Sequence, residues 1–146
     1  VVHFIGRLQS NKVRMIAPLV DLWHTVDRPA LIEEIGRRAP AARILLQVNL
    51  TDEPDKGGCG PEALEDLIGL ARSRRLDPIG LMTVGPTDGN VAATRRAFAR
   101  CANLAHDLGL AEVSMGMSGD LDIALDEGAT IVRVGSAIFG DRPPAR

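Results

Sequence analysis

The sequence is poor in aromatic residues, which make up 3% of its 146 residues, and tyrosine is absent. Proteins that bind single-stranded nucleic acid stack bases on aromatic side chains, and this chain has few of them. Its net charge of -2 gives no bulk attraction toward nucleic acid or an anionic membrane surface. No apolar run approaches the roughly 20 residues that a membrane-spanning helix needs. We therefore expect neither nucleic acid nor a membrane among the partners.

Cysteine is also rare, with Cys59 and Cys101 the only two. Neither belongs to a C-x-x-C motif or lies near a pair of histidines, so the sequence predicts no metal site. Cys101 falls within a helical pattern and is expected to be a small core residue. The opening residues VVHFIG have neither the basic region nor the cleavage site of a signal peptide. Few cysteines and no leader favour a reducing, cytoplasmic setting.

Short apolar runs alternate with segments of helical spacing along the chain, and this strict alternation predicts a parallel sheet with right-handed crossovers. The sheet is either an open doubly wound one or part of an eight-stranded barrel. The nucleotide-binding fingerprints expected of an open sheet, G-x-G-x-x-G and G-x-x-x-x-G-K-[ST], are missing. A whole barrel takes about 250 residues, so this chain can hold only part of one. The predicted strands cover 1–5, 22–26, 43–50, 78–84, 114–117 and 131–134. The predicted helices cover 13–20, 30–38, 61–73, 91–108 and 121–126.

The stretch 114–140 carries the strongest functional signal. Its two predicted strands end in small, hydroxyl-bearing turns, MSG at 117–119 and GS at 135–136, and each turn opens onto a segment that can be helical. Backbone N–H groups at a helix start form a cradle for an anion such as phosphate. In barrels of alternating strands and helices, a phosphate commonly lies in the loops after the last two strands.

Arg133 stands inside the last predicted strand, two residues before the glycine of the GS turn. A buried arginine needs a partner, because its charge cannot be removed at ordinary pH. Two partners are open at this point. One is a bound ligand, and the other is a carboxylate of the protein such as Asp122 or Asp126.

Five segments together resemble one family. They are HFIGRLQSNK at 3–12, HTVDR at 24–28, QVNLTDEPDKGG at 47–58, GLMTVGP at 80–86 and SMGMSGDLDIALDEGATIVRVGSAIFG at 114–140. In this combination, order and spacing the chain is similar to the pyridoxal phosphate homeostasis protein family, over essentially its whole length. No single segment would be specific, but the combination is.

The resemblance implies a single-domain α/β barrel of the TIM type, like the N-terminal domain of alanine racemase. It implies that pyridoxal 5′-phosphate binds at the carboxyl ends of the strands. Ser118 and the turn of Gly135 and Ser136 match the family's phosphate contacts, and Arg133 matches the arginine that faces the pyridine nitrogen. Met117, which precedes Ser118, is counted with these cofactor-binding residues.

The family binds and buffers the cofactor rather than turning over a substrate, so the resemblance implies a non-catalytic protein that takes part in vitamin B6 and amino-acid homeostasis, expected to be a monomer. Arg133 fits that role, because an arginine donates to the ring nitrogen without protonating it, which leaves a weaker electron sink. One alternative is a racemase or aldolase of the same fold, though the chain lacks a tyrosine that could serve as its base. Others are a fragment that binds no cofactor and a phosphate-binding barrel isomerase.

One part of the family pattern is missing. The lysine that binds the cofactor as a Schiff base lies in an AVSK-like segment on the family's first strand, followed by a GENYVQE-like segment on the second, and neither occurs here. We therefore expect residues 1–146 to form one barrel domain that lacks the first two βα units and holds about six of the eight. Lys12 and Lys56 match no cofactor lysine and are expected to be exposed charges. Any binding should then be weak and non-covalent.

Four further residues carry weaker predictions. His3 and His24 lie within predicted strands and are expected to be hydrogen-bonded histidines of the barrel interior, although a ligand contact is open for each. Asn49 and Met82 lie in or at the end of strands, so they are candidates for lining the cofactor pocket, with core packing an equal explanation for Met82.

Overall fold

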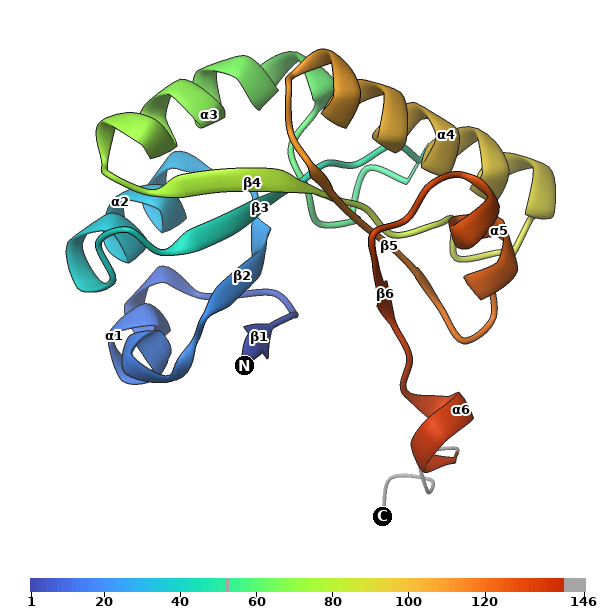
Figure 1. The fold of residues 1–146 in the computed structure, drawn as a ribbon, viewed down its shortest axis with the longest axis horizontal. Helices are drawn as coiled ribbons and strands as arrows, with labels where there is room; N and C mark the ends of the chain where they lie inside the picture. The colour runs from blue at the N-terminus through green and yellow to red at the C-terminus, as the bar shows by residue number, and fades with distance from the viewer. Residues whose placement is uncertain (52, 141–146) are drawn as a thin grey trace.

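A computed structural model describes residues 1–51 and 53–140. Its sheet has six strands, all parallel, in the order β1-β2-β3-β4-β5-β6, so that each strand pairs with the next one along the chain. The sheet curls, with the helices on its outer face except for the last one, which lies apart from the sheet beyond the end of β6, and with both edge strands on the open side (Figure 1). This confirms the prediction of a partial α/β barrel. The strands are β1 (His3–Phe4), β2 (Leu22–Val26), β3 (Arg43–Gln47), β4 (Asp77–Met82), β5 (Glu112–Met117) and β6 (Ile131–Arg133).

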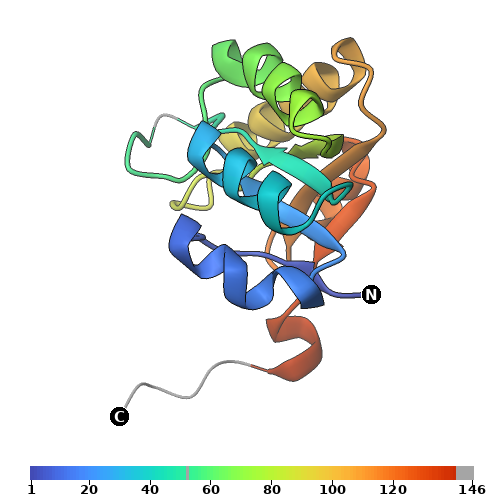
Figure 2. The same cartoon turned by 90° about the vertical axis from the view of Figure 1, so that its left-hand side faces the viewer.

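The helices follow the strands in strict alternation, as predicted. Along one side of the sheet, α1, α2 and α3 follow one another around the outside of the curl (Figure 2). The α-helices are α1 (Val13–Ile16), α2 (Pro29–Arg38), α3 (Leu64–Ser73), α4 (Val91–Asp107), α5 (Leu121–Asp126) and α6 (Ser136–Phe139). Short 3-10 turns are η1 (Ser10–Lys12), η2 (Ala17–Leu19) and η3 (Pro61–Ala63).

Most predicted elements differ from the structure by a few residues at their ends, and the strand expected over 1–5 is reduced to His3–Phe4. Two further differences can be followed in the structure. The helix expected over 13–20 is broken into α1 and η2, because Pro18 has no N–H to donate and cannot continue a regular α-helix. The strand expected over 43–50 ends at Gln47, and Val48 then forms only an isolated bridge with Cys59. The backbone after β3 thereby turns out of the sheet into the loop that precedes η3.

The two faces of the sheet are packed differently. The large apolar cluster lies between the sheet and the helices, and Trp23, Ile44 and Phe98 are among its fully buried members. A second, small cluster contains strand residues only, Leu22, Leu45 and Met82 as its buried members. The inner face of the curl is therefore sparsely apolar, and it is there that the buried polar side chains of the strands lie.

Candidate functional site at the carboxyl ends of β5 and β6

The guanidinium of Arg133, at the end of β6, turns inward rather than into solvent. Its Nη1 donates a hydrogen bond to the Ser114 hydroxyl over 3.0 Å, and its Nη2 donates to the carbonyl oxygen of Thr83 over 2.9 Å. These contacts tie β6 to β5 and to the residue that follows β4. Among the described residues, two of the five N–H donors of the guanidinium are used in this way, and the other three have no acceptor there.

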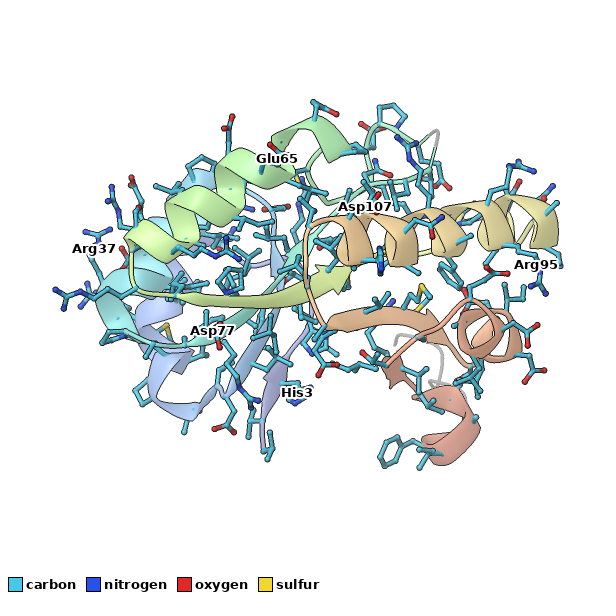
Figure 3. The ribbon with its side chains drawn as sticks, turned by 45° about the horizontal axis from the view of Figure 1, so that its top comes forward. His3, Arg37, Glu65, Asp77, Arg95 and Asp107 are labelled. Atoms are coloured by element: carbon cyan, nitrogen blue, oxygen red, sulfur yellow. The ribbon has the colours of Figure 1, made fainter. Side chains whose placement is uncertain are left out.

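The alternative that Arg133 pairs with Asp122 or Asp126 is wrong. Asp126 accepts a hydrogen bond from Arg95 at 3.1 Å instead, and Glu127 accepts a second one at 2.5 Å. Arg95 stands on α4 on the outside of the sheet, beside α5 (Figure 3). The carboxylates of Asp126 and Glu127 therefore serve a contact between two outer helices, and the arginine of the inner face is held by neutral oxygen atoms.

Ser114 connects Arg133 to two histidines. Its hydroxyl lies 3.0 Å from Nδ1 of His24 on β2, and Nε2 of His24 lies 3.0 Å from Nδ1 of His3 on β1. Ser114 and His24 are both fully buried, whereas His3 is exposed at the edge strand (Figure 3). The prediction of a buried, hydrogen-bonded histidine is thus correct for His24, and His3 is hydrogen-bonded but not enclosed.

Burial shifts the pKa values of two members of this arrangement, His24 and Arg133. Burial, together with the nearby His3 and Arg133, lowers the pKa of His24 from 6.5 to about 4. Burial also lowers the pKa of Arg133, while the charge of Asp120 opposes that shift. An arginine stays protonated at neutral pH even so, because its ordinary pKa is far above it. At neutral pH Arg133 is therefore a cation and His24 is a neutral imidazole.

The turns predicted to hold a phosphate come together at the ends of β5 and β6. The hydroxyl of Ser118 accepts a hydrogen bond from the N–H of Ala137, 3.3 Å away, so the turn after β5 lies beside the first turn of α6. Gly135 precedes α6 and Ser136 begins it, and both are exposed. A Cβ atom built on Gly119 or Gly135 would meet nothing within 4 Å, so the space around this backbone is open.

A cavity of about 230 Å³ opens beside Arg133 at the carboxyl ends of the strands. Met82 and Met117 line it, in line with the predicted pocket residues, whereas Ser118, Gly135 and Ser136 do not. Asn49 is also outside the lining, since its side chain bonds the backbone of Glu53 and Thr51. Further walls come from the segment after β1 and from the loop after β3, with Ile5, Gly6, Arg7, Leu8, Gln47 and Gly57.

A larger hollow of about 730 Å³ lies elsewhere, between the loop after β3 and the start of α4. None of the predicted site residues lines it. Lys56 lies near this hollow and is not the exposed charge that the sequence predicted, because its side chain is only 17% exposed. Its Nζ donates to the carbonyl oxygen of Gly85 at 2.5 Å and to the carboxylate of Glu53 at 3.1 Å. Lys12 is exposed, as expected, and neither lysine lines the cavity beside Arg133.

The sequence did not predict Ser114 and Thr83 as partners of Arg133. Both are fully buried polar residues, Ser114 within β5 and Thr83 directly after β4, and their place in apolar surroundings was the available signal. A polar residue in such a position requires a hydrogen-bond partner, but the sequence does not say which strand supplies it. In the part of the chain that the structure describes, no group of three or more His, Cys, Asp or Glu residues could hold a metal ion. No helix among the same residues has the length and apolar character to cross a membrane.

Comparison with known proteins places this arrangement in a family. The family model described as "Alanine racemase, N-terminal domain" matches residues 2–143. The "Pyridoxal phosphate homeostasis protein" of Pseudomonas aeruginosa is 43% identical over 150 residues, which cover 96% of this chain and 64% of that protein. That of Aquifex aeolicus is 40% identical, with 96% and 66% covered. The chain thus spans slightly less than two thirds of the length of these curated relatives.

Solved structures agree with this placement. PipY of Synechococcus elongatus, solved without pyridoxal phosphate, has a TM-score of 0.86 at 37% identity, with 94% of this chain and 70% of that chain covered. The structure of PipY with pyridoxal phosphate bound has a TM-score of 0.85 at 35% identity, with 94% and 69% covered. The chain therefore belongs to the alanine racemase N-terminal-domain family, in its group of pyridoxal phosphate homeostasis proteins.

Proposed function

We propose that this chain binds pyridoxal 5′-phosphate at the carboxyl ends of β5 and β6 and serves vitamin B6 and amino-acid homeostasis without catalysing turnover. The observation that carries the proposal is the inward guanidinium of Arg133, fixed by Ser114 and Thr83 in the wall of a cavity of about 230 Å³. The relatives named for this role, and PipY with the cofactor bound, support it.

The residues present fit the cofactor at both of its ends. Arg133 would face the pyridine nitrogen, because its unused N–H groups can donate to a neutral ring acceptor. Ser118, Gly135 and Ser136 would hold the phosphate through the hydroxyls of the two serines and the backbone N–H groups at positions 135 and 136. The next N–H groups of α6 are engaged already, since that of Ala137 donates to the Ser118 hydroxyl and those of Ile138 and Phe139 donate to the carbonyl oxygen of Gly135. The open space around Gly119 and Gly135 lets an anion approach the backbone closely. Met117 would border the ring from the cavity wall.

The chemistry of these residues favours holding the cofactor over using it. When bound, pyridoxal phosphate supplies an aldehyde and an electron-withdrawing ring. Arg133 does not protonate the ring nitrogen, because an arginine side chain keeps its proton in proteins, and so the ring withdraws electrons less strongly. Neither lysine lines the cavity, and we infer that binding is non-covalent. We also propose that the protein is a monomer and that it lies in the cytoplasm. The two free cysteines support the second of these, because a reducing compartment keeps thiols free.

The proposal is tested by equilibrium dialysis of the purified chain against pyridoxal phosphate and against pyridoxal, which lacks the phosphate. We expect pyridoxal to bind at least tenfold more weakly, because hydrogen bonds to a charged group contribute about 1.5–3 kcal/mol. Ser118→Ala should reduce the ratio of the affinities for pyridoxal phosphate and pyridoxal. Ser73→Ala, a change on the outer surface of α3, should leave this ratio unchanged. Equal affinity for both compounds would contradict the phosphate site.

A second experiment addresses attachment and catalysis. Borohydride treatment of the loaded chain, followed by intact mass measurement, should leave the protein mass unchanged. Incubation of the loaded chain with L-alanine should form D-alanine no faster than free pyridoxal phosphate does. A stable mass increase on Lys12 or Lys56 would overturn the non-covalent assignment, and rapid racemisation would favour the enzymatic alternative.

A further inference from the structure

The inner face carries a chain of hydrogen bonds that joins the two edges of the sheet. It runs from Arg133 on β6 through Ser114 on β5 and His24 on β2 to His3 on β1, with all three contacts at 3.0 Å. We propose that Ser114 and His24 are positioning residues for Arg133, and that Arg133 fixes the direction of all three of these hydrogen bonds. The inference deepens the proposed function, in which Arg133 contacts the cofactor ring.

The contact between His24 and Ser114 crosses the interior of the curl. The strands β2 and β5 are separated in the sheet by β3 and β4, so they are not hydrogen-bonded neighbours. Their side chains meet only because the sheet bends far enough to bring its inner faces together. The position of the Ser114 hydroxyl, and with it that of the guanidinium, is therefore tied to a strand on the far side of the half-barrel.

Which group donates in each of these hydrogen bonds follows from the donors that each side chain has. A guanidinium has donors only, so the Ser114 oxygen must accept from Arg133. The single O–H of Ser114 is then free to donate to Nδ1 of His24, and this nitrogen must therefore carry no proton. His24 consequently has its proton on Nε2 and donates it to Nδ1 of His3. Each group in the chain is satisfied in this arrangement.

The opposite direction leaves a buried donor without a partner. If Nδ1 of His24 donated to Ser114, the serine oxygen would accept twice and its own hydrogen would have no acceptor among its contacts. Ser114 is fully buried, so water does not replace that partner, and an unmade hydrogen bond of this kind costs about 1–3 kcal/mol. Among the described residues, the only fully buried side-chain nitrogen or oxygen atom without a partner is Nε1 of Trp23, which takes no part in these hydrogen bonds.

A neutral His24 is required for the same reason. A proton on Nδ1 would take away the acceptor for the Ser114 hydroxyl and place a second positive charge close to Arg133. The low pKa of His24, about 4, agrees with this requirement. The charge of Asp120 acts on Arg133 as well; this residue precedes α5, and its carboxylate accepts from the N–H of Met117 at 2.6 Å. Asp120 does not touch the histidines. Arg7 and Asp27 line the same cavity as Arg133.

The direct test is ¹⁵N NMR of the histidine rings in the ligand-free chain at pH 7. We expect His24 in a single tautomer with the proton on Nε2, and His3 accepting at Nδ1. The exposed His106 on α4, whose Nδ1 lies 3.4 Å from the Asp107 carboxylate, serves as an internal reference outside this series of hydrogen bonds. A proton on Nδ1 of His24 would overturn the proposal, and this measurement needs no variant.

Variants then separate positioning from simple packing. Ser114→Ala should release the tautomer preference of His24 and weaken binding of pyridoxal phosphate about tenfold, the loss expected for one hydrogen bond to a charged group. Ser114→Thr keeps the hydroxyl and should keep both the tautomer preference of His24 and the affinity for pyridoxal phosphate. Ser73→Ala should change neither of these two properties. If the tautomer preference is lost but affinity is unchanged, Ser114 does not position Arg133 for the ligand.

The outcomes distinguish this inference from the proposed function. If the unchanged chain binds no pyridoxal phosphate while His24 keeps its Nε2 proton, the binding proposal fails and the hydrogen-bond direction stands. If the chain binds the cofactor while His24 is protonated on Nδ1, the binding proposal stands and this inference fails. Should Ser114→Ala not fold, the tautomer in the unchanged chain and the affinity of His24→Gln still decide.

Discussion

Arg133 donates to the hydroxyl of Ser114 over 3.0 Å, so the cation of an edge strand is held by a neutral, fully buried oxygen of the neighbouring strand. A carboxylate in that place would neutralise the arginine and occupy its donors. A hydroxyl and a backbone carbonyl fix the guanidinium yet leave its charge and its remaining donors for another partner. This relationship underlies the proposed ligand site.

The stability of the folded chain should fall as the pH drops from about 6.5 to 4. In the unfolded chain His24 takes up a proton below its ordinary pKa of 6.5, whereas in the folded chain it does so only near pH 4. The unfolded state therefore binds more protons in this window, and the free energy of unfolding rises with pH across it. Urea unfolding of the chain and of His24→Gln at several pH values measures the effect.

His24→Gln should flatten the dependence of the free energy of unfolding on pH between 6.5 and 4, while His106→Gln, at an exposed position of α4, should leave that dependence in place. Glu53 gives a separate loss at lower pH, because hydrogen bonds from Thr87, then Lys56, lower its pKa from 4.5 to about 2. A profile of the unchanged chain that is level between pH 6.5 and 4 would contradict the buried, neutral state of His24.

Gly116→Ala should destabilise the fold by about 3 kcal/mol, combining a left-handed backbone with overpacking. Gly116, within β5, has a φ of 89°, and a Cβ atom there would lie 2.4 Å from the Cβ of Ala124 on α5. The matched control is Gly69→Ala in α3, where a Cβ meets nothing within 4 Å and helix propensity predicts a gain of about 1 kcal/mol. Denaturant unfolding compares the two, and similar values for both would contradict the packing of α5 against β5.

Cys101 should react with iodoacetamide only when the chain unfolds. It is fully buried, and burial raises its pKa to about 12, so at pH 8 almost no thiolate forms in the folded state. Cys59 is partly exposed with a pKa raised to about 11, so it should react slowly but without unfolding. Mass measurement of Cys59→Ser during labelling isolates Cys101. Its complete labelling within minutes in native buffer would be inconsistent with the described core.

Glu53→Gln should loosen the contact between the loops after β3 and β4. The Glu53 carboxylate accepts from the Thr87 N–H at 2.8 Å and from its hydroxyl at 2.5 Å, and it also contacts Lys56. Hydrogen exchange of the Thr87 amide should accelerate in the variant, because an amide side chain is a weaker acceptor than a carboxylate. Asp66→Asn on α3 is the control. Unchanged protection of Thr87 would show that the carboxylate does not hold the loop.

The sequence predicted some elements closely and others poorly, for physical reasons. The strand 22–26 and the helix 121–126 were predicted at their observed bounds, because turn-forming residues lie on both sides of each. The helix over 13–20 was not, because the apolar spacing continues through Pro18 while the hydrogen bonding does not. The order of strands followed from their alternation with helices, which leaves few topologies for a parallel sheet.

The site was predicted less completely than the fold. The motifs indicated Arg133 and the turns after β5 and β6, but not what holds Arg133. Its contact with Ser114 and the contact of Ser114 with His24 depend on how far the sheet curls, and His24 and Ser114 lie 90 residues apart in the chain. A local pattern carries no information on that curvature. The carboxylates near Arg133 in sequence, such as Asp126, face the outer helix α4 instead.

The measurement that tests the central claim most directly is the affinity of Arg133→Gln for pyridoxal phosphate, by equilibrium dialysis beside the unchanged chain. Arg95→Gln, which removes an arginine of the outer surface, is the matched control. We predict that Arg133→Gln weakens binding tenfold or more, the loss of about 1.5–3 kcal/mol expected when a charged donor is removed, and that Arg95→Gln binds as the unchanged chain does. Equal affinity in all three proteins would contradict the assignment of the cofactor site to Arg133.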